Sequence, residues 1–437
     1  MVFVPIYILI LFFTIIIDYF AGILIEKSKG KKRKLFLTFS LIANIGILAV
    51  FKYYNFFAQN FNILLTDIGA NSLIPYLSIL LPIGLSFHTF QAMSYTIEVY
   101  RGNQKAERHF GIYSLYVMFY PQLVAGPIER PQNLIHQFFE EHKFEYQRVI
   151  EGLRLMLVGF FYKLVVADRL AIYVNSVYQN HEHHNGTTLL IASIFFTFQI
   201  YCDFAGYSSI AIGVAKILGF NLMTNFKRPF FAKSIDEFWK RWHISLSTWF
   251  KDYLYISMGG NRVSISKRYF NLFFVFLVSG LWHGANWTYV IWGIINGFYL
   301  VFALITKTYK EGFYNFIKIN RFSSFINFNK VVTTFLLSTF AFIFFRAPDI
   351  NTALNIIEKI FTSTGKPFYD DISILVYSVV SILLLVVFEF NIEKSGNTNF
   401  YFRRDKLFIR HLSYAVIILI ILMLGVFDGG EFIYFQF

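Results

Sequence analysis

The chain has 437 residues, of which 56% are hydrophobic and 15% are charged. A soluble globular domain carries about 25% charged residues, so this composition excludes an ordinary soluble enzyme and predicts a protein that crosses a membrane several times. The net charge of +13 does not predict nucleic-acid binding, because the basic residues lie in short loops between apolar runs, where the positive-inside rule accounts for them.

Ten apolar segments follow one another along the chain with lengths suited to membrane-spanning helices. A further apolar stretch, at about 110–126, is interrupted by Pro121, Gly126 and Pro127 and predicts a re-entrant segment. We therefore expect an all-α polytopic membrane protein in which residues 1–437 form a single membrane-embedded domain. The expected spans lie at about residues 2–25, 35–51, 73–97, 152–178, 188–217, 270–286, 287–305, 331–346, 372–390 and 411–427.

Loop charge predicts the orientation of these spans. Lys and Arg exceed Asp and Glu in four loops, which we expect on the cytoplasmic side: 26–34, 220–268, 306–330 and 391–410. The loops 181–186 and 347–371 lack this excess and are expected outside. Counting spans between the loops gives ten crossings with both termini outside. The first span is long and is followed by a basic loop, so we expect it to persist rather than be cleaved as a signal peptide.

The cytoplasmic region 220–268 carries an unusual amphipathic pattern. Ser234 and Glu237 form a capping-box signature that predicts a helix start at Ser234, and Gly259-Gly260 ends the pattern. On a helical wheel, one apolar side collects Trp239, Trp242, His243, Leu246, Phe250 and Tyr253. Two interpretations stay open for His243: a ring packed at the membrane interface with a hydrated tip, or a ring presented inward to a cavity shared with His283.

His283 lies in the string SGLWHGANWTYVIWG, inside a predicted hairpin of two spans over 270–305. An ionisable side chain deep in a bilayer is costly, so it is a functional-site candidate by default. Imidazole also moves protons near neutral pH. The alternative is a structural histidine that is hydrogen-bonded across helices. The pairs Gly280/Gly284 and Gly293/Gly297 predict close helix approach.

Other motifs restrict the chemistry. The chain has no GxxxxGK[ST] loop and no GxSxG nucleophile elbow, which argues against ATP hydrolysis and a hydrolase-type serine. Its single cysteine, Cys202, excludes an internal disulfide and a multi-cysteine metal site. The cluster His181, His183 and His184 is interpreted as an exposed outer turn rather than a metal site, and we expect no bound metal.

Five strings resemble the membrane-bound O-acyltransferase (MBOAT) family. Within it they are most similar to the branch that O-acetylates exported polysaccharide, typified by the alginate O-acetylation membrane subunit. The strings are LPIGLSFHTFQAMSYTIEVYRG (81–102), YPQLVAGPIERP (120–131), NFKRPFFAKSIDEFWKRWHISLSTWFKDYLYISMGGNR (225–262), LVSGLWHGANWTYVIWG (277–293) and FIYFQF (432–437).

The resemblance implies a ring of about 10–11 transmembrane helices around a central tunnel, with amphipathic and re-entrant helices. It aligns His283 with the family's catalytic histidine and His243 with its second favoured polar position. We expect substrate or tunnel contacts from Trp282, Asn286, Trp242 and Asp252. Two departures are a missing N-terminal hairpin and Asn296, where relatives often carry a further histidine, so no role of that histidine transfers here.

The resemblance also implies a function. We expect an O-acetyltransferase of the bacterial cytoplasmic membrane that takes acetyl groups from acetyl-CoA or another acyl thioester, with no bound cofactor. An extracytoplasmic SGNH-hydrolase-like partner then places them on an exported polysaccharide. The alternatives are D-alanyl transfer to teichoic acid, a transporter that uses His283 as a proton relay, and a scaffold subunit without chemistry.

Overall fold

The computed structural model describes residues 7–69, 73–78, 82, 84–123, 126–316, 323–397, 400–402, 406–428 and 432–433. Within these ranges every regular element is a helix, so the all-α prediction is confirmed. Several predictions fall partly or wholly outside the described residues, among them the outer placement of Met1, part of the loop 306–330, the end of the C-terminal string, and parts of the spans 2–25 and 73–97 and of the re-entrant stretch 110–126.

Among the described residues, seven helices are long and apolar enough to cross a membrane, and each overlaps one of the ten predicted spans. The three other predicted spans are also helical over much of their length, as α4 (Leu85–Arg101), α7 to α8 (Tyr146–Gln179) and α12 (Ile265–His283). The seven candidate spans are Tyr7–Lys27, Gly30–Asp67, Gly186–Leu218, Trp287–Lys307, Ser324–Arg346, Ile372–Ser395 and Leu407–Leu424.

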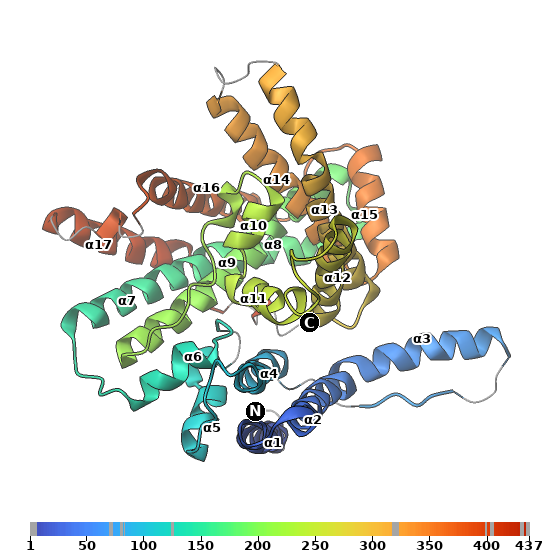
Figure 1. Ribbon diagram of the computed structural model, residues 1–437. Coiled ribbons are helices and arrows are strands. Elements are labelled where there is room, and N and C mark those ends of the chain that lie inside the picture. Colours follow the sequence, from blue (N-terminus) through green and yellow to red (C-terminus); the bar gives the residue numbers. More distant parts are fainter. Residues whose placement is uncertain are drawn as a thin grey trace. The chain divides into compact units, whose positions relative to one another are not determined.

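The helices group into two compact units, each with its own hydrophobic core. Unit 1 comprises Met1–Gly152 and Ala211–Met223. Its centre is the packing of α1, α2 and α4 on one another, and the chain continues from α2 through a π-helical turn into α3, which extends away from that bundle (Figure 1). The helices of this unit are α1 (Tyr7–Lys27), α2 (Gly30–Leu48), η1 (Ala49–Tyr53), α3 (Tyr54–Asp67), α4 (Leu85–Arg101), α5 (Phe110–Met118), η2 (Tyr120–Gln122), α6 (Pro131–Leu134) and η3 (Ile135–Phe139).

The predicted re-entrant stretch is a short helix followed by a turn. Helix α5 ends at Met118, and Pro121 lies in the single 3-10 turn Tyr120–Gln122. Proline cannot donate a backbone hydrogen bond within a helix, so the chain leaves the helical path where the sequence pattern indicated. Residues 124 and 125 lie outside the described part of the chain.

Unit 2 comprises Leu153–Ile210 and Thr224–Phe437 and carries both candidate histidines. Two helices are shared with unit 1: unit 2 holds residues 153–160 of α7 and residues 186–210 of α9 (Gly186–Leu218). Helix α9 runs through the core of unit 2, and 83% of the residues in its apolar window are buried within the protein. The remaining helices are α7 (Tyr146–Phe160), η4 (Phe161–Ala167), α8 (Asp168–Gln179), η5 (His181–His183), η6 (Pro229–Phe231), α10 (Ile235–Arg241), α11 (Ile244–Trp249), η7 (Phe250–Tyr255), α12 (Ile265–His283), α13 (Trp287–Phe316), α14 (Ser323–Arg346), α15 (Ile350–Thr362), α16 (Ile372–Ser395), η9 (Phe400–Phe402) and α17 (Leu407–Leu424).

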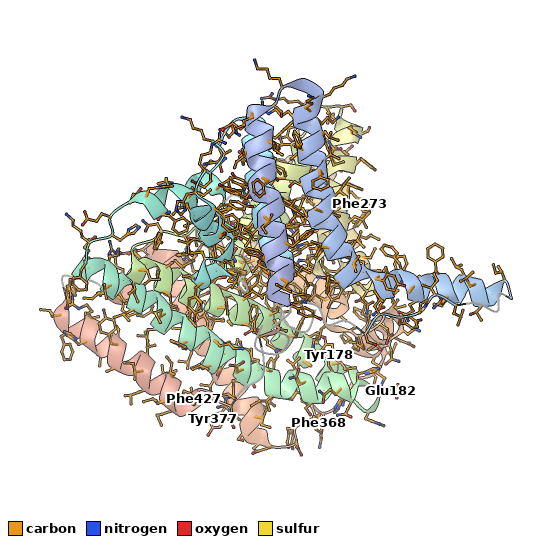
Figure 2. All side chains as sticks on the ribbon, turned by 90° about the horizontal axis from the view of Figure 1, so that it is seen from below. Tyr178, Glu182, Phe273, Phe368, Tyr377 and Phe427 are labelled. Carbon is orange, nitrogen blue, oxygen red and sulfur yellow. The ribbon has the colours of Figure 1, made fainter. Side chains whose placement is uncertain are left out.

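The turn between α8 and α9 packs on the end of α15 and on the segment that follows it. Lys359 Nζ donates to the carbonyl oxygen of Glu182 at 2.6 Å, and the rings of His184 and Phe368 lie 4.5 Å apart. Figure 2 labels Glu182 and Phe368 of these two parts. Glu182 and His183 are exposed, as expected for an outer turn.

The hairpin of α12 and α13 is packed backbone to backbone, as its glycines predicted. A Cβ atom at Gly280 would lie 2.3 Å from the carbonyl oxygen of Tyr289 and 3.1 Å from the Cα of Gly293. Neither Gly280 nor Gly293 leaves room for a side chain. The small residues therefore set the helix separation that holds the end of α12 in place.

Gly280→Ala should destabilise the protein by about 1–3 kcal/mol, because the new methyl group forces the two backbones apart. Thermal unfolding of the purified protein measures this. Gly46→Ala in α2 is the matched control, since nothing lies within 4 Å of its added Cβ and alanine is the better helix former. Equal unfolding temperatures for Gly280→Ala and the wild type would contradict the packing argument.

Candidate functional site

The predicted amphipathic helix begins where the sequence indicated but is not continuous. The Ser234 hydroxyl accepts a hydrogen bond from the backbone N–H of Glu237 at 3.2 Å, and the Glu237 carboxylate accepts one from the backbone N–H of Lys233 at 2.8 Å. Helix α10 then ends at Arg241, and α11 begins at Ile244. The prediction of one helix from Ser234 to the glycines was wrong.

The break has a clear cause in backbone pairing. The N–H of Lys227 donates to the carbonyl oxygen of Arg241 at 2.9 Å. The N–H of Ile244 donates to the carbonyl oxygen of Asn225 at 2.8 Å. These bonds to a preceding segment replace the next helical turn. They also hold His243 at a φ of 42°, in the left-handed region that side chains other than glycine rarely adopt.

Only two non-glycine residues in the described chain have a positive φ, Arg228 and His243. They belong to the two segments that pair with each other. Strained backbone of this kind costs about 1–3 kcal/mol and clusters at functional sites. The strain is therefore an observation, independent of the sequence motif, that marks His243 as a functional candidate.

Asn225 fixes the orientation and the tautomer of His243. Its Oδ1 accepts from the Ser245 backbone N–H at 3.3 Å and from the Ser245 hydroxyl at 2.9 Å, and it lies 3.1 Å from His243 Nδ1. An N–H can only donate, so the atom facing it is the oxygen of the amide, and His243 Nδ1 must carry its proton. The lone pair then belongs to Nε2. Burial lowers the pKa of His243 to about 3, which keeps the ring neutral at pH 7.

His243 is buried in aromatic surroundings. Its side chain is 1% exposed, and its ring lies 4.5 Å from Phe204 and 6.1 Å from Phe226, centroid to centroid. The expected position on the apolar side of the amphipathic segment is confirmed. The alternative of a ring with a hydrated tip is wrong, because the protein itself encloses the ring.

His283 is the last residue of α12 and lies at the turn of the hairpin, not partway along a span. The turn continues through Gly284 to Asn286, and α13 begins at Trp287. Asn286 Oδ1 accepts from the backbone N–H of Thr288 at 3.0 Å, and its Nδ2 donates to the carbonyl oxygen of Pro348 at 2.7 Å. Asn286 thus caps α13 and ties the turn that carries His283 to the chain after α14, while its expected contact with substrate or tunnel stays a prediction.

Three aromatic rings surround His283, which is 6% exposed. The ring centroids of Trp282, Trp292 and Phe345 lie 5.0, 4.9 and 5.1 Å from that of the histidine. Trp282 therefore packs against His283, and its expected contact with substrate or tunnel stays a prediction. Trp287, in contrast, is half-exposed.

A continuous set of aromatic contacts connects the two histidines. Trp242 lies 5.3 Å from Phe226 and 5.3 Å from Phe342, and Phe342 lies 6.2 Å from Phe345, which contacts His283. All of these residues line or pack against one hydrophobic core. The expected cavity shared by the two histidines stays a prediction. Each ring nevertheless contacts this core: His243 through Phe226, and His283 through Trp292 and Phe345.

Asp252, a further expected site residue, lies after the helix that follows His243. It is half-buried in the π-helical turn η7 that follows α11. Such turns are frequent at functional sites. Its expected contact with substrate stays a prediction.

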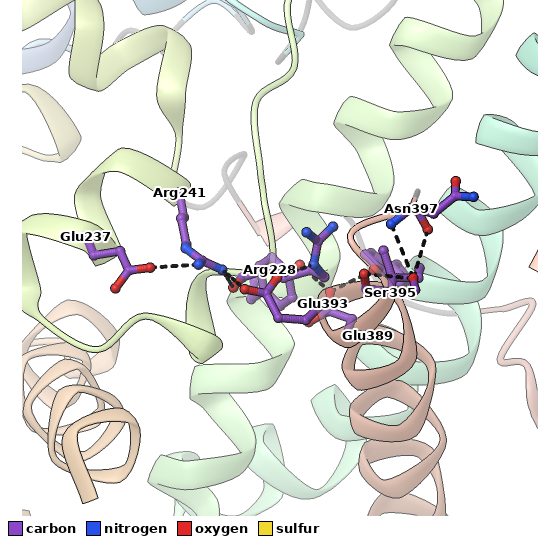
Figure 3. A network of polar contacts seen from close by, with 10 residues as sticks. Arg228, Glu237, Arg241, Glu389, Glu393, Ser395 and Asn397 are labelled. Atoms are coloured by element: carbon purple, nitrogen blue, oxygen red, sulfur yellow. Dashed lines mark hydrogen bonds and ion pairs between the residues drawn. The ribbon is translucent and has the colours of Figure 1, made fainter. Parts of the chain in front are cut away.

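One carboxylate holds both strained segments. Glu393 on α16 accepts from Arg228 Nε at 2.7 Å and from Arg241 Nη1 at 2.8 Å, and Arg241 also pairs with Glu237 at 2.6 Å (Figure 3). One turn earlier on α16, Glu389 accepts from the hydroxyl groups of Tyr162 and Tyr201. Helix α16 therefore fixes the loop before α10 and the end of α10, the two elements that define His243.

Glu393→Gln should destabilise the protein by about 1.5–3 kcal/mol, because a carboxamide offers one acceptor oxygen where two guanidinium groups need one each. Activity should fall in parallel as His243 loses its position. Thermal unfolding and turnover measure the two effects. Asp236→Asn on α10 is the control: it breaks only an exposed pair with Lys240, and such pairs contribute little. A Glu393→Gln variant as stable as this control would contradict the positioning role.

Sequence reasoning missed Asn225 and Glu393. Asn225 opens one of the strings that carry the family resemblance, so a signal was present, but its contact with His243 depends on the backbone break. Glu393 is separated by 165 residues from Arg228 and by 152 from Arg241, and no local pattern links them.

The described chain is a polytopic α-helical membrane protein whose unit 2 encloses two buried histidines in one aromatic core. The profile of the family described as MBOAT, membrane-bound O-acyltransferase, matches residues 109–345, more than half of the chain. The chain belongs to the membrane-bound O-acyltransferase family.

Its similarity to curated relatives extends beyond that region. The chain is 37% identical over 349 residues to a probable alginate O-acetylase AlgI of Pseudomonas aeruginosa, covering 79% of this chain and 64% of that protein. It is 33% identical to a peptidoglycan O-acetyltransferase of Helicobacter pylori over 79% of this chain and 68% of that one. It is 27% identical to a teichoic acid D-alanyltransferase of Bacillus subtilis over 60% of this chain and 68% of that protein. The chain thus spans slightly less than two thirds of the P. aeruginosa protein's length.

Proposed function

We propose that this protein is an O-acyltransferase that moves acetyl groups from a cytoplasmic thioester across the membrane for O-acetylation of an exported polysaccharide. The observation that carries the proposal is the pair of buried imidazoles, His283 and His243, enclosed by one aromatic core of a membrane protein in this family. A charged donor cannot cross hydrocarbon, whereas an acetyl group can pass between two substrates that meet at a site inside the protein.

His283 is the proposed catalytic residue. Its imidazole removes the proton from the acceptor hydroxyl, the oxygen bonds to the thioester carbonyl carbon, and the C–S bond breaks as the sulfur takes a proton back from the imidazolium. In a second route the imidazole nitrogen itself accepts the acetyl group, releases the thiol and then passes the acetyl group to the hydroxyl. Both routes need a ring held in one orientation, which the three surrounding aromatic rings provide.

His243 assists from the other end of the aromatic set. Its Nδ1 is committed to Asn225, so Nε2 is the nitrogen that acts on substrate, as a neutral base or as an acceptor that orients the hydroxyl. Trp282 and Trp242 line the path between the two rings, and Asn286 holds the turn that carries His283.

The donor is an acyl thioester, and acetyl-CoA fits best. Its phosphates require a basic surface on the cytoplasmic side. Exposed basic side chains lie before and after His243 in the sequence: Lys227, Lys233, Lys251 and Arg262. The positive-inside rule already accounts for these charges. We therefore propose phosphate binding separately from the acyl transfer. No cofactor is required.

The acceptor is an exported polysaccharide, reached through an SGNH-hydrolase-like partner outside the cytoplasmic membrane of a bacterium. The similarity to the P. aeruginosa protein supports an alginate-like glycan, and that to the H. pylori protein supports peptidoglycan. Transfer of D-alanine to teichoic acid is less well supported, because the corresponding relative is less similar and covers less of this chain. A transporter that uses His283 as a proton relay and a scaffold subunit are less well supported, because the chain belongs to a family of O-acyltransferases.

Mass spectrometry of the secreted glycan and of peptidoglycan, from cells with and without the gene, tests the proposal. Acetate esters should disappear from one of them in the deletion and return with the wild-type gene. If both keep their acetate esters, the acetylation proposal fails. Loss of D-alanyl esters from teichoic acid instead would establish the alternative.

A further inference from the structure

A polar cluster with no place in the proposed reaction lies inside unit 1. Asp18 of α1, Ser40 and Asn44 of α2 and Thr96 of α4 are each 0% exposed. The helices α1 and α2 are both candidate membrane spans. Ionisable groups in such helices are rare and mark ion or substrate sites.

The cluster is organised around the carboxylate of Asp18. Its Oδ1 accepts from the Ser40 hydroxyl at 2.6 Å and from Asn44 Nδ2 at 3.0 Å, while its Oδ2 accepts only from Asn44 Nδ2, at 2.8 Å. Ser40 Oγ also lies 3.1 Å from Thr96 Oγ1. Side chains of α2 thus contact the carboxylate of α1 directly, and Ser40 joins Thr96 of α4 to the same cluster.

These contacts leave the charge of Asp18 without compensation. Its interactions in the described chain are those with Ser40 and Asn44, and no cationic side chain is among them. A buried carboxylate without a cation is strongly disfavoured. Neutral hydrogen-bond donors reduce that penalty but do not neutralise the charge.

Two further oxygen atoms also lack partners. Asn44 Oδ1 is buried and has no hydrogen bond among the described residues, although the nitrogen of the same amide contacts Asp18. The hydroxyl of Tyr113 on α5, a residue that is 0% exposed, is likewise without a hydrogen bond and lies within electrostatic range of Asp18. An orphaned buried oxygen is a reason to look for an ion.

We propose that Asp18, Ser40, Asn44 and Thr96 form a binding site for a dehydrated monovalent cation of the sodium class. Carboxylate, hydroxyl and amide oxygens are the donors that hard cations prefer. One carboxylate balances one positive charge, so a divalent ion would leave excess charge in the bilayer. The bound cation joins α1, α2 and α4 and stabilises unit 1. The cation site does not depend on the proposed acyl transfer, so an experiment can refute one of the two without refuting the other.

Thermal unfolding of the purified full-length protein tests the site. Sodium chloride should raise the unfolding temperature by a few degrees relative to choline chloride at equal ionic strength, with saturation, because only a small cation binds the folded state. Asp18→Asn should abolish the sodium effect. Asp67→Asn, which alters an exposed carboxylate in the same unit, should retain it.

Thr96→Val keeps the side-chain shape and serves if Asp18→Asn does not fold; it should weaken the sodium dependence. Radioactive sodium should bind the wild type and not the Asp18 variant. Equal unfolding temperatures in sodium and choline would overturn the proposal. A sodium effect that persists in Asp18→Asn would also overturn it. The same holds if the wild type does not respond to sodium but loses stability as pH rises, because a proton rather than a cation would then neutralise the carboxyl group of Asp18.

Discussion

Replacing His283 with alanine should lower acetylation of the exported polysaccharide by at least about 10²-fold, because general acid–base help of this kind is typically worth 10²–10⁴-fold. The protein should still accumulate in the membrane. The ring lies at the end of α12, where the glycine contacts between α12 and α13 fix the hairpin without it. The measurement is ester content of the secreted glycan, with protein level followed by immunoblot.

The matched control is His183→Ala, which removes an exposed histidine from the turn before α9 and should leave acetylation unchanged. Thermal unfolding separates lost chemistry from lost folding, since a cavity left by the ring lowers stability by a few kcal/mol at most. Normal acetylation in His283→Ala would remove the histidine from the reaction and favour a scaffold role for the chain.

Much of the fold was predictable because membrane spans leave a strong sequence signal. Hydropathy located every one of the seven candidate spans in the described residues. The pairs Gly280/Gly284 and Gly293/Gly297 predicted the close hairpin, and the capping box predicted the start of α10, with Ser234 as its N-cap. Each of these features is set by residues a few positions apart.

The break at His243 was not predictable from the same local signals. The sequence from Ser234 onward favours one long helix by periodicity, and nothing in it prevents a helix at Trp242 or His243. The chain leaves the helix because residues 225–227 offer backbone partners and because Glu393, on a distant helix, holds both arginines. Contacts that join residues so far apart in sequence override local propensity.

The second large effect is expected at His243, and its positive φ allows the chemistry to be separated from the backbone. His243→Ala loses the imidazole and retains a side chain that disfavours a φ of 42°. His243→Gly loses the same imidazole but adopts that φ without strain. Acetylation should fall severely in both variants, with residual activity possible because His283 is intact.

Stability should distinguish the two variants. Each leaves the same aromatic pocket of Phe204 and Phe226 partly empty, but glycine relieves backbone strain that alanine keeps, and left-handed backbone costs roughly 1–2 kcal/mol for a residue with a Cβ. His243→Gly should therefore unfold at a temperature no lower than His243→Ala, although glycine gains more entropy in the unfolded chain. Thermal unfolding of both proteins, beside acetyl transfer, measures this.

If His243→Gly restored acetylation toward the wild-type level, the ring would be dispensable and the left-handed turn itself would be the feature that matters. Asn225→Asp supplies the complementary control. A carboxylate still accepts from His243 Nδ1 and from Ser245, so the tautomer is kept, but the negative charge beside the ring favours the imidazolium. An adjacent opposite charge moves a pKa by about 1–3 units, and the pKa of His243 starts at about 3, so the ring should stay neutral at pH 7. Activity should therefore be retained at neutral pH and should fall only in acid, where a protonated Nε2 has no lone pair to accept the hydroxyl proton.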